Sequence, residues 1–161
     1  AMTTYAGQNV GAKEFDRVEQ GAKQGTFIAM GVSAVITGLI LIFGKQLMGI
    51  FTETTELVDM SMRMMKILAV GYIAMAVTQS LSGIMRGAGD TMSPMWISLV
   101  TTVAIRVPVA YGIAYITRSE QYPGGRCESV FISLLVSWTL GAVITFICYK
   151  WGKWKKKAIG E

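Results

Sequence analysis

Four stretches of the chain consist almost entirely of apolar residues, and short polar segments separate them. The stretches cover residues 24–44, 67–85, 92–117 and 129–149. Within them the only charged residue is Arg106. A helix needs about 20 mostly apolar residues to cross the hydrocarbon core of a bilayer. The pattern therefore predicts an all-α, polytopic transmembrane helical bundle with four membrane-spanning helices.

The segments between these stretches are polar. Residues 1–23 carry apolar positions at helical spacing, which predicts a loop with an interfacial helix. Residues 45–58 are expected to form a loop, and residues 118–127 contain the turn sequence Pro-Gly-Gly. Residues 150–161 form a basic tail.

Small and charged residues at helical spacing predict contacts. Ala34 and Gly38 allow another helix to approach the first span closely. Asp59 and Arg63 are spaced so that they can pair. In the last span small residues recur at every fourth position, which predicts a stripe that packs on another helix. These residues are Ser133, Ser137, Gly141 and Thr145.

Composition and charge agree with a single bundle in a lipid bilayer. The chain is 52% hydrophobic and 16% charged, with a net charge of +5. Five of its lysines directly follow the last span and lie among aromatic residues, as at a helix end among lipid headgroups, so we expect no nucleic-acid partner. Of the Lys and Arg residues outside the spans, nine lie on the side of both termini and five on the other. The excess predicts cytoplasmic termini in a multi-pass protein of the plasma membrane of a prokaryote.

The residues needed for catalysis or metal binding are scarce. The chain has no histidine, and its two cysteines are predicted on opposite membrane faces, so we expect no metal site, cofactor or disulfide. An integral membrane enzyme acting on lipids is the rival from another class. Only Asp90, Glu128 and Cys148 are candidates for its chemistry, so we expect no enzyme.

Arg106 lies near the middle of the third stretch, where a charge facing lipid costs about 3 kcal/mol or more. Ser98 and Thr102 lie eight and four residues before it, on the same helix face. Pro108 removes a backbone hydrogen bond and should kink this helix. Arg106 either lines a cavity and shapes the passage of substrate or ion, or pins a bent helix to its neighbours. We favour the second interpretation, because no span contains a carboxylate to pair with it.

Polar residues also lie midway along the second span. Thr78 and Gln79 are found there with Met75 one turn earlier, and they either face a substrate or form hydrogen bonds between helices. Hydrogen bonding is the commoner role. Together with Ser98, Thr102 and Arg106, these three residues are the predicted lining of a substrate cavity. Trp138 lies deeper than an interfacial aromatic residue, and packing is its favoured role.

A short connection joins the second and third spans. Arg86 and Asp90 are predicted to end their helices at one membrane face. Gly87 and Gly89 are predicted to adopt backbone angles that other residues disfavour. The structural residues of this region and of the following helix are Gly83, Arg86, Gly87, Gly89, Asp90, Thr91, Pro94 and Pro108.

Several segments resemble one family of secondary transporters. Residues 7–12 read Gly-Gln-Asn-Val-Gly-Ala, and residues 83–91 read Gly-Ile-Met-Arg-Gly-Ala-Gly-Asp-Thr. With Phe51-Thr52 and Arg106-Val107-Pro108, these segments resemble the multidrug and toxic compound extrusion (MATE) family over essentially the whole chain. Such transporters have twelve spans in two six-helix lobes. The chain is similar to the last four spans, within the C-terminal lobe.

The resemblance implies a multidrug efflux antiporter that exports cationic or amphipathic compounds in exchange for sodium ions or protons. It implies that small drug-like molecules and the remaining helices of the parent transporter are partners, beside the bilayer. Some members carry an acidic residue near the position of Met75, and this chain does not. We therefore expect the coupling ion to bind mainly outside it. A flippase of lipid-linked saccharides, from the same superfamily, is the alternative.

Overall fold

The computed structural model describes residues 1–152 and 154, and most of them are helical. The elements are α1 (Met2–Gly11), α2 (Phe15–Gly49), α3 (Thr55–Gly87), α4 (Met92–Leu99), the π-helix η1 (Val100–Arg106), α5 (Val107–Ile116) and α6 (Glu128–Trp151). Among the described residues, four helices are long and apolar enough to cross a membrane: α2, α3, the continuous series α4–η1–α5, and α6. The predicted all-α, polytopic fold is confirmed.

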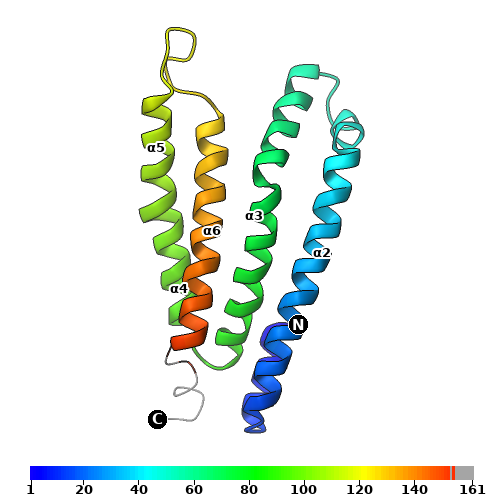
Figure 1. The fold of residues 1–161 in the computed structure, drawn as a ribbon, viewed down its shortest axis with the longest axis vertical. Coiled ribbons are helices and arrows are strands. Elements are labelled where there is room, and N and C mark those ends of the chain that lie inside the picture. The colour runs from blue at the N-terminus through cyan, green and yellow to red at the C-terminus, as the bar shows by residue number, and fades with distance from the viewer. Residues whose placement is uncertain (153, 155–161) are drawn as a thin grey trace.

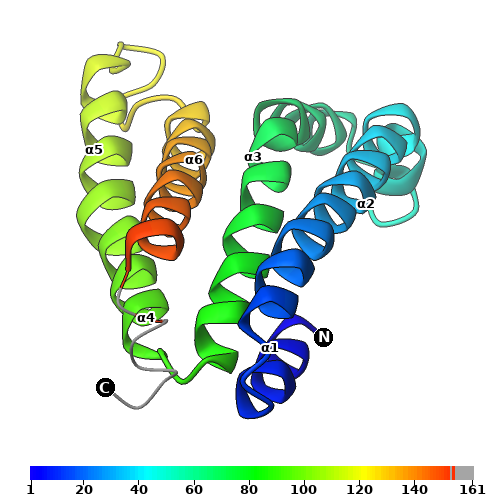
Figure 2. The same ribbon diagram turned by 60° about the horizontal axis from the view of Figure 1, so that its bottom comes forward.

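The four long helices stand side by side, with α3 and α6 in the middle (Figure 1). α3 contacts α2 on one side and α6 on the other, and α6 also contacts all three parts of the third span. The loops after α2 and α5 lie at one end of the bundle. α1, the turn between α3 and α4, and the end of α6 lie at the other, which we call the α1 end (Figures 1 and 2).

The helix ends differ from the predicted boundaries because two helices are longer than a membrane needs. α2 has 35 residues and α3 has 33, which corresponds to roughly 50 Å each at 1.5 Å per residue. Residues 15–23, predicted as an interfacial segment, continue directly into the first span. The predicted loop 45–58 is shorter, because helix covers both of its ends and leaves residues 50–54 between them. Of the basic tail, residues 153 and 155–161 lie outside the described residues.

α1 folds back and fills the crevice between the start of α2 and the end of α3 (Figure 2). The Tyr5 hydroxyl donates to the Arg17 carbonyl oxygen at 2.8 Å. Around this helix lies the main buried apolar cluster of the described chain. It consists of Ala6, Val18, Ala22, Ile84, Met85, Ala88, Ile97 and Trp154. The tightest packing is therefore at the α1 end.

Gly87 permits the close approach of α1 to α3. A Cβ atom at this position would meet the Thr3 carbonyl oxygen, and would lie 2.8 Å from the Ala6 Cβ and 3.1 Å from the Gly7 nitrogen. Gly87 is helical and its φ is not positive. The prediction that it adopts an unusual backbone angle is therefore wrong: its small size matters because a neighbouring backbone occupies the space.

Gly89 does have the predicted conformation, with φ of +88°, a region that favours glycine. It ends the tight connection after α3. Asp90 follows, and its carboxylate accepts hydrogen bonds from the Ser93 hydroxyl at 2.6 Å and the Ser93 amide at 3.4 Å. An acceptor for a free amide of the first turn stabilises a helix start. Asp90, at 2% exposure, therefore helps to begin α4.

One of the predicted contacts is wrong, one is confirmed, and one has no partner helix in the described part of the chain. Nothing lies within 4 Å of a Cβ built at Gly38, so the face of Ala34 and Gly38 meets no other helix among the described residues. Asp59 pairs with Lys45 at 3.3 Å, and Arg63 pairs with Glu128 at 3.6 Å, so each has a partner on a neighbouring helix rather than the other. The predicted stripe on α6 is buried over its whole length, with Ser129 extending it at one end.

The third span contains seven residues of π-helix that end two residues before Pro108, where a kink was expected. Proline lacks the amide that would bond the carbonyl of Ala104, four residues earlier. Within the π-helix, the Thr101 carbonyl oxygen has a partner on another helix: the Ser137 hydroxyl of α6 donates to it at 2.7 Å, in a buried position. Within a bilayer such a partner has to come from the protein itself. α6 therefore holds the π-helix in place.

Many large apolar side chains on the outer faces of the bundle are exposed. Phe27 and Ile42 of α2 are 72% and 68% exposed, and Tyr111 and Ile116 of α5 are 74% and 81% exposed. An apolar surface of this extent is unfavourable in water. The bundle therefore requires the lipid bilayer as its surroundings.

We predict that Gly87→Ala destabilises the full-length protein. The added methyl group meets the backbone of α1, and overpacking of this kind costs about 1–3 kcal/mol. The thermal unfolding midpoint of the purified protein in detergent should fall. Gly11→Ala is the control, because nothing lies within 4 Å of that position in another helix. Equal midpoints for both variants would show that α1 does not pack tightly on α3.

We also predict that Ser137→Ala lowers stability by about 1 kcal/mol, because it removes the buried hydrogen bond between α6 and the Thr101 carbonyl. Thr139→Ala is the matched control. Thr139 is on the same helix, is exposed, and donates only within its own helix, to the Leu135 carbonyl. The measurement is again the unfolding midpoint in detergent. A larger effect for the Thr139 variant would contradict the role given to Ser137.

Candidate functional site

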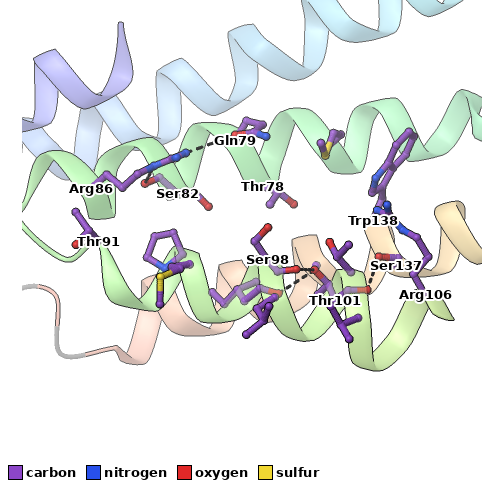
Figure 3. Close-up of a pocket in the computed structure, with 18 residues that line it drawn as sticks. Thr78, Gln79, Ser82, Arg86, Thr91, Ser98, Thr101, Arg106, Ser137 and Trp138 are labelled. Atoms are coloured by element: carbon purple, nitrogen blue, oxygen red, sulfur yellow. Dashed lines mark hydrogen bonds between the residues drawn. The ribbon is translucent and has the colours of Figure 1, made fainter. Parts of the chain in front are cut away.

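A groove of about 660 Å³ lies between α3, the third span and α6 (Figure 3). α3 forms one wall, α4 and η1 form the opposite wall, and α6 contributes the floor. The six residues predicted to line a cavity all lie along it. They are Met75, Thr78 and Gln79 of α3, Ser98 of α4, and Thr102 and Arg106 of η1. The structure thus places these residues of two spans around one groove.

The wall formed by α3 continues beyond the predicted residues to Ser82 and Arg86. The Arg86 Nε donates to the Ser82 carbonyl oxygen at 3.2 Å, and its Nη2 lies 3.5 Å from the Gln79 Oε1. The guanidinium therefore lies back along the groove, as Figure 3 shows. The sequence analysis assigned Arg86 only to the turn. The signal that was missed is its spacing: Met75, Gln79, Ser82 and Arg86 recur at three or four residues, on one helix face.

The opposite wall ends at Arg106. This residue lies 14 positions after the first residue of α4, which is roughly 21 Å along the helix at 1.5 Å per residue. Its side chain is half-buried and is directed from η1 towards Trp138, into the groove (Figure 3). Its Nε is fully buried and has no hydrogen-bond partner among the described residues. The arginine thus faces the groove without a counter-charge in this part of the chain.

The floor is formed by Ser137, Trp138 and Gly141 of α6. Trp138 packs over Gly71 of α3, and its ring centroid lies 5.7 Å from that of Tyr72. The expected packing role of Trp138 is therefore observed, and one part of the side chain also faces the groove. Gly141 lies beside Thr101: a Cβ at this position would be in ordinary van der Waals contact with the Thr101 Cγ2, at 3.6 Å.

The groove carries positive charge. Arg86 lies near the α1 end and Arg106 lies deeper, and no residue in the described lining is an Asp or Glu. Seven hydroxyl-bearing residues line the groove together with several apolar ones, among them Met75, Met95 and Leu99. Such a surface suits the binding of a molecule with an apolar body. Among the described residues, no group of three or more His, Cys, Asp or Glu is arranged to hold a metal ion.

The residues predicted as structural fall into three places. Gly83 and Gly87 face α1, while Gly89 and Asp90 shape the turn. Thr91 and Pro94 line the groove at its α1 end. Pro108 lies just beyond the π-helix. The sequence around the turn therefore reaches the groove through Arg86, Thr91 and Pro94 and contacts α1 through Gly83 and Gly87.

Comparison with known proteins gives the family. The model of the MatE family matches residues 1–112, which is more than half of the chain. The chain is 26% identical over 159 residues to a probable multidrug resistance protein, YoeA, of Bacillus subtilis, and 23% identical over 159 residues to the probable multidrug resistance protein NorM of Thermotoga maritima. Each alignment covers 99% of this chain and 33% of the relative.

A third relative is the probable multidrug resistance protein NorM of Streptococcus pneumoniae, at 24% identity over 94% of this chain and 31% of that protein. The chain thus spans about a third of the length of the curated relatives it matches. No solved structure matches it. The family and its relatives indicate a transporter rather than an enzyme. The resemblance seen in the sequence is confirmed, and the chain belongs to the MatE family.

Proposed function

We propose that this chain supplies one wall of the substrate cavity of a multidrug efflux antiporter, which exports cationic or amphipathic compounds in exchange for sodium ions or protons. The observation that carries the proposal is the groove between α3, the third span and α6. It combines apolar and hydroxyl-bearing side chains, and in a membrane-spanning bundle such a cavity is a candidate substrate path. The relatives named as multidrug resistance proteins support the same function.

The coupling ion is proposed to bind elsewhere in the parent transporter. Sodium ions need oxygen ligands, usually with a carboxylate among them, and a proton carrier in a membrane is typically an Asp, Glu or His. The described lining of the groove contains none of these residues. The helices of the parent beyond this chain supply the carboxylate, and movement of the two lobes about the central cavity gives access to each side in turn.

In this proposal the protein lies in the plasma membrane of a prokaryote, with both termini in the cytoplasm. The support is the excess of Lys and Arg on one side of the bundle. α1, the α3–α4 turn and the end of α6 all lie at that side. The α1 end is then cytoplasmic, and the groove extends from it into the membrane.

We predict that Thr102→Trp in the full-length transporter lowers export of the cationic dye ethidium at least tenfold, because the indole fills the groove. Export is measured in inside-out vesicles under an imposed sodium or proton gradient, per folded molecule. Val100→Trp is the control, because Val100 is also in the π-helix and exposed but does not line the groove. Both variants should keep the unfolding temperature of the parent. Export that persists after both gradients are collapsed would refute antiport.

We predict that Cys127 reacts from outside the cell. It is exposed in the loop before α6, at the end opposite α1. A membrane-impermeant maleimide applied to intact cells should label a full-length transporter whose only cysteine is Cys127. It should spare one that carries Met92→Cys as its only cysteine, because Met92 is exposed beside the α3–α4 turn. In inside-out vesicles the pattern should reverse. Labelling of both positions from the same side would contradict the four-span topology.

A further inference from the structure

The charge of the groove is the feature that the proposed function leaves unexplained. Two arginines, Arg86 and Arg106, face it, and its described lining contains no carboxylate. A cationic substrate would meet two like charges on this wall. In a medium of low dielectric constant, like charges repel over longer distances than in water. This wall of the cavity therefore favours a negatively charged group of the substrate over a positively charged one.

Arg106 is the residue that most needs a negative partner. Its Nε is buried and has no hydrogen-bond partner among the described residues. The two other polar residues of its helix face, Ser98 and Thr102, are neutral and also line the groove. A half-buried guanidinium inside a membrane-spanning bundle favours a negative partner, and its planar fork of donors matches a carboxylate or sulfonate in two hydrogen bonds. The side chain of Arg106 therefore has the chemistry of an anion site.

The surroundings of Arg106 indicate what else the ligand carries. The arginine side chain is directed towards Trp138, and Met75 lines the wall on the facing helix (Figure 3). An indole ring and a thioether accept flat apolar groups of varied shape. An inorganic anion would leave these apolar surfaces uncovered. An organic anion with an apolar body covers them.

We infer that the deep end of the groove binds the acidic group of an amphipathic organic anion at Arg106, with the apolar body of the ligand against Trp138 and Met75. The inference rests on the proposed transport function and names a substrate class for it. Arg86 is exposed nearer the α1 end and is held along the groove by Ser82 and Gln79. It provides a second positive charge on the path to the site, which raises the local concentration of anions.

Three probes with one ring system test the inference: pyrenebutyrate, pyrenebutanol and pyrenebutylamine. They share a pyrene ring and a four-carbon chain, and at pH 7 they are negative, neutral and positive. Their Kd values are measured by fluorescence titration of the purified full-length transporter in lipid nanodiscs. The acid should bind the parent protein most tightly. Arg106→Gln should weaken binding of the acid about tenfold to a hundredfold, the effect of losing hydrogen bonds to a charged group. Binding of the alcohol should change less than twofold.

Two further variants separate charge from shape. Arg106→Lys keeps the charge and loses the planar fork, so its affinity for the acid should lie between those of the parent and Arg106→Gln. Arg118→Gln removes a charge from an exposed arginine that does not line the groove, and it should leave all three affinities unchanged. If Arg106→Gln does not fold, the ratio of acid to alcohol affinity in the parent protein still tests the inference.

Three results would overturn the inference. The alcohol binding as tightly as the acid would show that no anion is recognised. Equal weakening of all three probes by Arg106→Gln would show that the arginine only shapes the groove. The amine binding most tightly would show that carboxylates from the remaining helices set the charge of the cavity. Failure of the proposed transport function would give another result. Ethidium would then show no gradient-driven movement in vesicles, whichever of the three probes binds most tightly.

Discussion

The hydrogen bond from the Ser137 hydroxyl to the Thr101 carbonyl connects the features on which the groove depends. Thr101 belongs to the π-helix of the third span, which ends two residues before Pro108. The Ser137 hydroxyl fixes this segment against α6, and inside a bilayer no water competes for the bond. The position of the π-helix in turn sets where Thr102 and Arg106 project. The polar wall of the groove thus depends on the contact between the π-helix and the small-residue stripe of α6.

The sequence predicted the spans and the buried stripe of α6 because both depend on local periodicity. Apolar length decides what crosses a membrane, and four-residue spacing places Ser133, Ser137 and Gly141 on one helix face whatever lies opposite. Contacts that depend on the partner were harder to predict. Ala34 and Gly38 have the spacing for close approach, and no described helix approaches them. Gly87 looked like a turn residue, and its true neighbour is a helix some 80 positions earlier, which no local pattern indicates.

The same distinction applies to the groove. Its two predicted halves, around Gln79 and around Arg106, were recognised as polar positions in apolar helices. A polar side chain inside a membrane is costly unless it faces the protein interior or a cavity. The two halves face one another because α3 and the third span both pack on α6. No local sequence pattern indicates this packing. Arg86 was predictable in part, since it continues the helix face of Met75 and Gln79. The π-helix was not, because a proline in a span is equally compatible with a simple kink.

The distribution of packing along the bundle gives this groove its place in a transporter. At the α1 end the apolar cluster around Ile84 and Met85 fixes α1, α2 and α3 together. The third span contacts α6 throughout but meets α3 mainly near the turn between them. α6 packs on α3 as well as on all three parts of the third span, so it joins the two walls of the groove and forms its floor. The Thr101–Ser137 bond lies within this connection, and because no water inside a bilayer can replace a buried bond of this kind, it keeps the polar wall in a fixed relation to α6 and through α6 to α3.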